Sequence, residues 1–177
     1  MHLKLGLATL MVGFSVLAQG LVSTYSSIAY NKCINSSTGE GGSSATCLGP
    51  QGITLDIASG DWTNMWIQYK GKKFETWELV ISAGSFNRIG GDNQVVEWVL
   101  DKSIEGQTRV HSLIARISGT DQRTQTVKSK LLVFGFTSLG VCYRGESVSN
   151  IGARQIAESS QCLKNLPIAL QEPAHSK

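Results

Sequence analysis

The chain has 177 residues, of which 41% are hydrophobic and 16% charged, and its formal net charge at pH 7 is +3. Basic residues are dense only in the segment 70–73, which suits a solvated turn better than the long basic face, interleaved with aromatics, that nucleic-acid binding needs. Nucleic-acid binding is therefore disfavoured, and the length fits one domain with a substantial core.

The first 20 residues have the pattern of a secretory signal peptide. Lys4 precedes an apolar run over 5–17, and the small-residue site Ala18-Gln19-Gly20 follows. The run is shorter than the roughly 20 residues that cross a membrane. We predict a signal peptide over 1–20, with an alternative cleavage after Ala29. The expected product is a periplasmic or secreted protein without a membrane span in the mature chain.

Four cysteines follow this segment, at Cys33, Cys47, Cys142 and Cys162. An even number in an exported chain favours two disulfides, for which three connectivities exist. We favour Cys33–Cys47 and Cys142–Cys162, because each pair closes a short segment. The first would close the Gly/Ser-rich loop 35–46, and the second would attach a C-terminal helix to a strand. The rival is a tether between the two ends of the domain, such as Cys33–Cys162.

Alternation of apolar and polar residues from Gly52 onward predicts a series of strands. In the third of them, Trp77, Leu79 and Ile81 share one face. Glycine-containing turns at 70–72, 90–93 and 105–107 separate several of the strands. The predicted strands cover residues 53–58, 64–69, 75–82, 94–101, 108–118 and 129–137, and 140–144 extends the last.

The hydrophobic period changes after Ser149. Residues Ala153, Ile156 and Ala157 recur at helical spacing, which predicts a helix from Ser149 or Asn150 to Cys162. We therefore predict a mainly β (α+β) fold, in which an antiparallel sheet forms a sandwich or barrel with one C-terminal helix. A single disulfide-stapled domain is expected over 30–166, followed by a flexible tail at 167–177.

The residues give little support for catalysis. His111 is the one histidine in the predicted body of the domain, and zinc needs three or four ligands. No G-x-S-x-G marks a nucleophile, and Ser112 should point away from His111 because neighbouring strand residues face opposite sides. The carboxylates Glu97 and Asp101 would lie about 13 Å apart on a strand, too far for glycoside hydrolysis. We predict no catalytic residue, no metal and no cofactor.

The tryptophans carry the main binding signal. Trp62 and Trp66 flank Asn64, while Trp77 and Trp98 fall in predicted strands. Tryptophan usually packs in a core, and its alternative use is the aromatic wall of a pocket or partner surface. The candidate ligand- or partner-binding residues are therefore Trp62, Asn64, Trp66, Trp77 and Trp98.

Two segments resemble known families. Gly60-Asp61-Trp62 resembles the G-x-W that opens the first strand of lipocalin and avidin-like barrels, which implies a small apolar ligand enclosed in a barrel. Such a cavity would be lined by Trp62, Trp77, Trp98 and Phe134. The segments Cys142-Tyr143-Arg144-Gly145 and 150–158, with Cys162, are similar to the C-terminal signature of small uncharacterised periplasmic proteins of alphaproteobacteria. That resemblance implies an exported, disulfide-linked strand–helix end.

Together these features favour a non-enzymatic exported binding or accessory protein whose partner is a protein or a cell-envelope component. We expect the contact surface at the Trp62–Trp66 segment and the Cys33–Cys47 loop. One alternative is a carrier of a small apolar ligand in a lipocalin/avidin-like barrel. The other is a hydrolase that uses His111.

Overall fold

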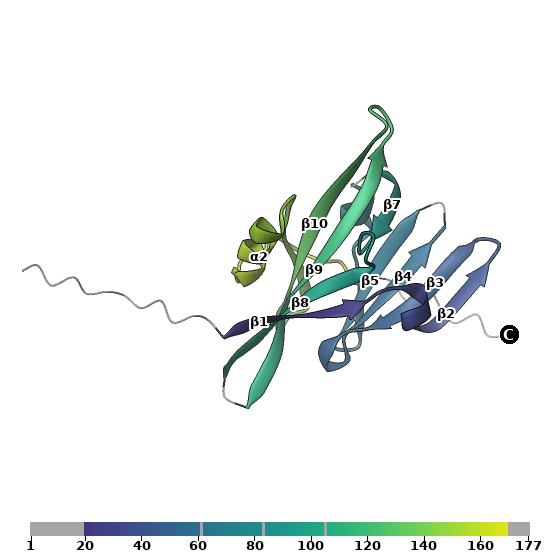
Figure 1. The fold of residues 1–177 in the computed structure, drawn as a ribbon. Helices are drawn as coiled ribbons and strands as arrows, with labels where there is room; N and C mark the ends of the chain where they lie inside the picture. The colour runs from purple at the N-terminus through teal and green to yellow at the C-terminus, as the bar shows by residue number, and fades with distance from the viewer. Residues whose placement is uncertain (1–19, 61, 83, 105, 170–177) are drawn as a thin grey trace, which may run out of the picture.

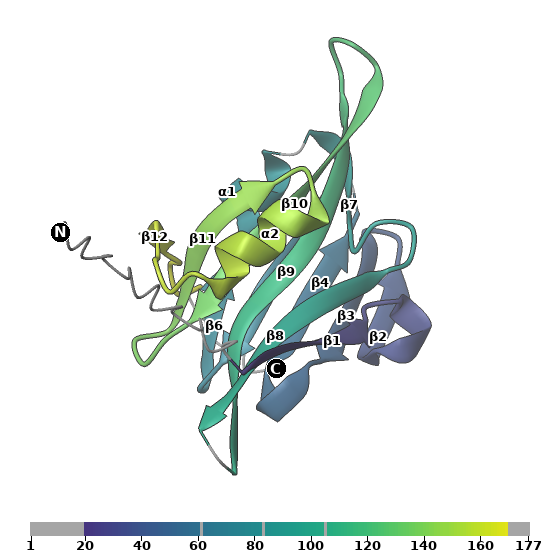
Figure 2. The ribbon, with the colours of Figure 1, turned by 60° about the vertical axis from the view of Figure 1, so that its left-hand side comes forward.

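Two antiparallel β-sheets pack face to face in the computed structural model, which describes residues 20–60, 62–82, 84–104 and 106–169 (Figure 1). The seven-stranded sheet has the order β1-β8-β9-β10-β11-β12, with β7 also paired to β9. The five-stranded sheet has the order β2-β3-β4-β5-β6. Helix α2 lies on the face of the seven-stranded sheet that is turned away from the five-stranded sheet (Figure 2).

The predicted mainly β fold with antiparallel sheets is confirmed, and of the two predicted architectures the described part of the chain forms a sandwich rather than a closed barrel. The seven-stranded sheet contains β1 (Leu21–Ser27), β7 (Ser85–Ile89), β8 (Val95–Ile104), β9 (Gln107–Asp121), β10 (Thr126–Phe136), β11 (Val141–Ser147) and β12 (Lys164–Asn165). The five-stranded sheet contains β2 (Ile34–Gly39), β3 (Gly42–Leu48), β4 (Thr54–Ser59), β5 (Thr63–Tyr69) and β6 (Lys72–Glu75). The two α-helices are α1 (Trp77–Ile81) and α2 (Asn150–Glu158), and short 3₁₀ turns span Tyr30–Lys32 and Pro50–Gly52.

The main core fills the space between the two sheets. Because strand side chains alternate between faces, Met65 and Ile67 of β5 point inward and are 0% exposed, while Asn64 and Trp66 point to the other face. The seven-stranded sheet contributes side chains that are equally buried: Trp98, Leu113, Leu132 and Phe134. The outer face of the five-stranded sheet is left uncovered by this arrangement.

A second, smaller core lies between α2 and the seven-stranded sheet. Ala153 and Ala157 of α2 are buried against Val99, Ile114 and Val133, and the short alanine side chains let the helix approach the sheet closely. The helix begins where predicted, since the Ser149 hydroxyl accepts a hydrogen bond from the Gly152 N–H at 3.1 Å. It ends at Glu158, four residues before the predicted end.

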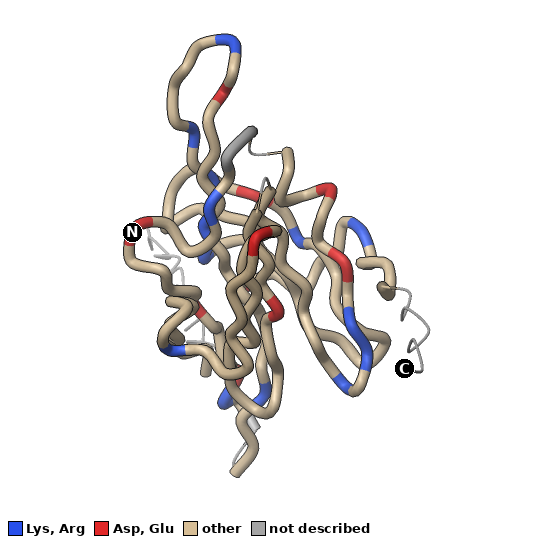
Figure 3. The backbone as a smooth tube through the Cα atoms, turned by 90° about the vertical axis from the view of Figure 1, so that its right-hand side faces the viewer, with Lys and Arg blue, Asp and Glu red and all other residues tan. Residues whose placement is uncertain are grey.

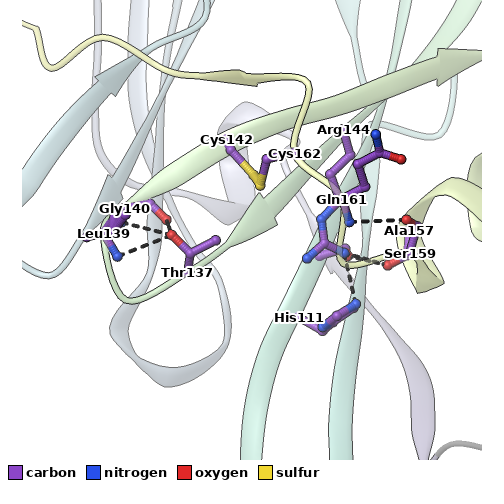
Figure 4. Close-up of a disulfide and its surroundings, with 11 residues drawn as sticks. His111, Thr137, Leu139, Gly140, Cys142, Arg144, Ala157, Ser159, Gln161 and Cys162 are labelled. Carbon is purple, nitrogen blue, oxygen red and sulfur yellow. Dashed lines mark hydrogen bonds between the residues drawn. A yellow bond between two sulfur atoms is a disulfide. The ribbon is translucent and has the colours of Figure 1, made fainter.

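The structure contains the two disulfides that the sequence favours, Cys33–Cys47 and Cys142–Cys162. The first joins the segment before β2 to β3. The second joins β11 to the chain that leaves α2 (Figure 4). After this bridge the chain pairs with β11, where the Leu163 N–H donates to the Tyr143 carbonyl at 2.8 Å. Both disulfides are thus local staples rather than a tether between the ends of the domain.

The predicted strand at 75–82 is wrong, because β6 ends at Glu75 and the next residues form α1. Trp77, Val80 and Ile81 also have helical i, i+3, i+4 spacing, and Val80 is fully buried. The short helix carries the chain from the edge of the five-stranded sheet to β7 in the other sheet. The described chain therefore has the short helix α1 in place of the predicted strand, as well as the predicted C-terminal helix.

The ends of the described chain are part of the fold. Strand β1 pairs with β8 from Leu21↔Asp101 to Ser27↔Val95, so the sheet begins before the predicted domain start at residue 30. Residues 167–169 of the predicted tail pair with β6, with Ile168 bridging Phe74. The rest of that tail, and residues 1–19 of the predicted signal peptide, lie outside the described residues. None of the described helices is long and apolar enough to cross a membrane.

Candidate functional site

The outer face of the five-stranded sheet gathers most of the candidate binding residues. The strand register places outward side chains in two rows across the sheet. One row runs through Ser37, Ser44, Ala58 and Asn64, and the other through Thr46, Asp56, Trp66 and Glu75. Trp62, in the connection between β4 and β5, and Trp77, at the start of α1, stand beside these rows. We call Trp62, Asn64, Trp66, Glu75 and Trp77 the tryptophan face.

One carboxylate organises the tryptophan face. Glu75 Oε1 accepts hydrogen bonds from Asn64 Nδ2 and from the Trp77 backbone N–H, both at 3.0 Å. Glu75 Oε2 accepts from Trp66 Nε1 at 2.6 Å. Hydrogen bonds to an ionised acceptor are stronger than neutral ones. The carboxylate therefore fixes an amide, an indole and the start of α1 relative to one another.

The two outermost tryptophans are unusually exposed. Trp62 is 47% exposed and Trp77 is 36% exposed, and their ring centroids lie 6.2 Å apart in an edge-to-face arrangement. A tryptophan side chain normally buries most of its area, so two exposed indoles in contact form an apolar surface on an otherwise polar sheet face. Among the described tryptophans, Trp62 and Trp77 are the two that are exposed.

A charged cluster borders the tryptophan face. Burial raises the pKa of the Asp56 carboxyl, but hydrogen bonds from Lys73, Gln68 and Thr46 outweigh it and hold this pKa below its ordinary value. Lys73 Nζ lies 3.0 Å from Asp56 Oδ2 and 4.8 Å from the centre of the Trp66 ring. The Lys73 ammonium group therefore contacts both the Asp56 carboxylate and one face of the Trp66 ring.

Two grooves adjoin on this surface. A groove of about 710 Å³ lies between the tryptophan face and the β2–β3 hairpin, and another of about 400 Å³ lies beyond Trp77 toward Lys164 and Pro167. Asn64 and Trp77 line both of them. The candidate surface therefore extends over both grooves, and Trp77 lies where they meet.

Trp98 lies elsewhere. It is 0% exposed, its Nε1 donates to Ser26 Oγ at 2.7 Å, and its ring packs so closely on Gly49 that an added Cβ would lie 2.4 Å from it. Phe134 is equally buried in the core. Trp62 and Trp77 are on the outside of the sandwich, so the four side chains expected to line one barrel cavity do not share a cavity.

A different cavity, of about 570 Å³, opens between the two sheets. Its apolar lining includes Ile28, Ile57 and Ile89, and Asn87 and Asp92 are among its polar residues. Asn87 is committed to the fold, because its side chain binds the Thr63 backbone N–H at 3.0 Å and the Thr63 and Val80 carbonyls.

His111 belongs to a buried cluster around Arg144 (Figure 4). Arg144 Nη1 lies 2.8 Å from each of three acceptors: His111 Nε2, Ser112 Oγ and the Ala157 carbonyl near the end of α2. Burial lowers the pKa of His111, and the positive charge of Arg144 lowers it further. Arg144 donates to Nε2, so this nitrogen of the neutral imidazole acts as an acceptor and is already occupied.

The expected opposite orientation of His111 and Ser112 is wrong. The register between β8 and β9 shifts at this point, from Val99↔Ser112 to Leu100↔Val110, so His111 is the extra residue of a β-bulge. The bulge turns both side chains toward Arg144. The Ser112 hydroxyl donates to the Ala157 carbonyl at 2.7 Å rather than to the histidine.

Some contributors to the candidate site went unrecognised in the sequence. The sequence predicts Glu75 only as the first residue of a strand, whereas the observed turn holds just residues 70 and 71 and so pairs Trp66 with Glu75. Of the described His, Cys, Asp and Glu residues, no three come together in a way that could hold a metal ion. Trp62, Asn64, Trp66 and Trp77 are brought together, whereas Trp98 is not.

This chain matches no protein-family model, no curated protein and no solved structure in the comparisons made. No relative therefore assigns a role to the tryptophan face or to the cluster around Arg144. A function has to be inferred from the chemistry that these surfaces present.

Proposed function

We propose that this chain is an exported, non-enzymatic binding protein of the periplasm or extracellular space, which contacts a protein or cell-envelope component through the tryptophan face. The observation that carries the proposal is the pair of exposed indoles, Trp62 and Trp77, beside the Asn64 and Trp66 side chains that Glu75 holds in place. Tryptophan is strongly enriched among the residues that dominate binding energies.

Rigidity of the surface favours binding as its role. A site whose side chains are already ordered loses less entropy when its partner arrives. Here Asn64 and Trp66 share one carboxylate, and Lys73 packs on the Trp66 ring. The uncovered sheet face thus presents a preorganised aromatic patch.

Export is supported by two features of the chain, and the resemblance predicted from the sequence agrees with them. Two disulfides are typical of oxidising compartments. Residues 1–20 carry the signal-peptide pattern, and the C-terminal segment resembles periplasmic proteins of alphaproteobacteria. An envelope component is therefore the natural first place to look for the partner.

The buried cluster supports a structural role for His111 over the hydrolase alternative. A general base needs a free ring nitrogen that can reach the proton it removes. Nε2 of His111 is occupied by Arg144, and the Ser112 hydroxyl is turned to the Ala157 carbonyl at the end of α2. The cluster joins α2 to the sheet beneath it.

The proposal is tested by binding the purified protein to fractionated envelope of its source cells. The double variant Trp62→Ala/Trp77→Ala should lose binding. The control Leu139→Ala/Val148→Ala also removes two exposed apolar side chains, each 83% exposed, from other parts of the surface, and it should bind like the wild type. Equal binding by the tryptophan variant and the wild type would overturn the proposal.

The cavity between the sheets favours a second candidate, a carrier of a small apolar ligand. Its lining includes Ile28, Ile57 and Ile89, and its volume of about 570 Å³ is within the range of small-molecule sites. A carrier should release a bound apolar molecule on denaturation, seen by native mass spectrometry. The variant Ile57→Trp, which fills the cavity, should carry none; if its load equals that of the wild type, the cavity is not the site.

A further inference from the structure

We infer that the tryptophan face and its two grooves bind a neutral oligosaccharide of several pyranose rings. This inference rests on the proposed function and narrows its partner to one chemical class. It starts from the lining of the larger groove, in which the described residues carry no charged side chain. These residues are Ser37, Thr38, Gly39, Gly41, Gly42, Ser43, Ser44, Ala58, Ser59, Gly60, Trp62, Asn64, Trp66 and Trp77.

That lining combines two kinds of surface. The indole rings of Trp62, Trp66 and Trp77 are broad and apolar, whereas the serine hydroxyls and the Asn64 amide both donate and accept hydrogen bonds. A pyranose ring has the complementary pair of surfaces, a flat face of C–H groups and a rim of hydroxyls. A purely apolar ligand would form no hydrogen bonds with the serine hydroxyls of the groove.

Charge on this side of the molecule also favours an uncharged ligand. Lys73 is paired with Asp56, and Lys164, at the far groove, lies 2.8 Å from Glu78. Basic and acidic positions are interspersed along the backbone in the view of Figure 3 rather than separated. An anionic ligand would find no unpaired cation among the described residues of these two grooves.

Asn64 is the polar anchor at the point where the grooves meet. It is 6% exposed, its Oδ1 accepts from the Met65 N–H at 2.8 Å, and its Nδ2 donates to Glu75. An amide nitrogen has two hydrogens, and the described residues engage one of them. The second hydrogen and the remaining acceptor capacity of the Glu75 carboxylate are suited to a sugar hydroxyl, which both donates and accepts.

The shape of the surface indicates a chain of sugars rather than a single one. The grooves of about 710 and 400 Å³ lie on either side of Trp77 and share Asn64. A monosaccharide would cover one indole, whereas consecutive rings could contact Trp62 and Trp77 together.

The wall opposite the tryptophans is held in place by a close contact between two main-chain segments. Gly42 has a φ of +129°, and a Cβ on it would lie 2.2 Å from the Ser59 carbonyl oxygen. The β2–β3 hairpin and the β4–β5 connection therefore meet main chain to main chain, which requires glycine. The Cys33–Cys47 disulfide fixes the other end of the same hairpin, so both walls of the groove are held.

Calorimetric titration of the full mature protein tests this inference. The neutral probes are hexasaccharides of glucose in β-1,4 linkage, of N-acetylglucosamine in β-1,4 linkage and of glucose in α-1,4 linkage, with an oligogalacturonate as the charged comparison. At least one neutral hexamer should bind with a Kd of roughly 10 μM to 1 mM, and more tightly than its dimer. Its affinity should stay constant between about 0.05 and 0.5 M salt.

Variants locate the binding. Trp62→Ala and Trp77→Ala should each weaken the hexamer about tenfold, as expected for loss of one stacking surface. Trp62→Phe, which keeps a ring, should lose less, and the surface control Leu139→Ala should bind like the wild type. If both tryptophan variants bind the hexamer as the wild type does, the inference is overturned because the sugar binds elsewhere.

Failure of this inference can be told apart from failure of the proposed function. No binding of any neutral hexamer up to about 10 mM, together with envelope binding that still depends on Trp62 and Trp77, would overturn the oligosaccharide and leave the proposed function standing. The partner would then be a protein or another envelope component. Loss of that tryptophan dependence as well would overturn both.

Discussion

Replacing Glu75 by alanine should loosen the tryptophan face and destabilise the domain. The carboxylate accepts three hydrogen bonds, from Asn64 Nδ2, Trp66 Nε1 and the Trp77 N–H. After the substitution, water can replace the carboxylate as hydrogen-bond acceptor, and it reaches these three donors to different degrees. The amide of Asn64 is 6% exposed, whereas Trp77 is accessible to solvent.

The magnitude follows from that difference. An unsatisfied buried donor costs about 1–3 kcal/mol, and Asn64 is the donor that water reaches least. The bonds from Trp66 and Trp77 contribute about 0.5 kcal/mol each, because water can take their place. Glu75→Ala should therefore lower the free energy of unfolding by about 2–4 kcal/mol.

Urea unfolding followed by circular dichroism measures this loss as a lower midpoint at an unchanged m-value. The emission of the exposed tryptophans should also shift to longer wavelength in the folded variant. Glu78→Gln is the matched control, because the partner of Glu78 among the described residues is Lys164 at the surface, and loss of this exposed pair should leave the midpoint unchanged. A Glu75→Ala midpoint equal to that of the wild type would refute the idea that this carboxylate organises the face.

Three further predictions concern the rest of the fold. Burial and Arg144 lower the pKa of His111 in the folded state, so the unfolded state takes up the proton first as the pH falls. The stability that the neutral imidazole contributes is therefore present above about pH 6.5 and declines as the pH falls through the folded-state pKa. Urea unfolding from pH 8 to 5 should show this decline, and the decline should be smaller in His111→Gln. Replacing Cys142 and Cys162 by serine opens a loop with a sequence separation of 20 and should cost about 3 kcal/mol, whereas an unchanged thermal midpoint would show that the pairing with β12 suffices. If the chain is exported as proposed, N-terminal sequencing of the product should give Leu21 rather than Tyr30, because cleavage after residue 29 would remove β1 from its pairing with β8. Recovery of a stably folded chain that starts at Tyr30 would contradict this prediction.

The sequence was most informative where hydrophobic alternation was strong. Strand β5 and helix α2 were predicted within a few residues, because Met65 and Ile67 alternate with polar neighbours and Ala153 and Ala157 recur at helical spacing. Strands β2 and β3 were missed because serine and glycine have low strand propensity, and a disulfide with its pairing to β4 orders that hairpin instead. Residues 21–27 fall in the predicted region of signal cleavage, so the sequence does not predict β1.

The candidate site shows the same limit. Spacing alone placed Trp62, Asn64 and Trp66 together, but it could not separate them from Trp98, whose burial depends on packing between two sheets. The bulge at His111 is likewise invisible to a rule of strict alternation, since it arises from the pairing of β8 with β9. Both features depend on contacts between strands that are distant in the sequence, and local sequence patterns do not predict such contacts.

The position of β1 also constrains the order in which the chain folds. This strand comes first in the described chain, yet its pairing partners in β8 lie 68 to 80 residues later, and Trp98 donates to Ser26 across a separation of 72 residues. The seven-stranded sheet cannot acquire this edge until β8 has been synthesised, and such non-local pairing makes folding slow, on a scale of roughly milliseconds to seconds. For a chain that is exported as proposed, this late pairing is useful, because β1, next to the signal peptide, stays unpaired and able to pass through the membrane in an unfolded state.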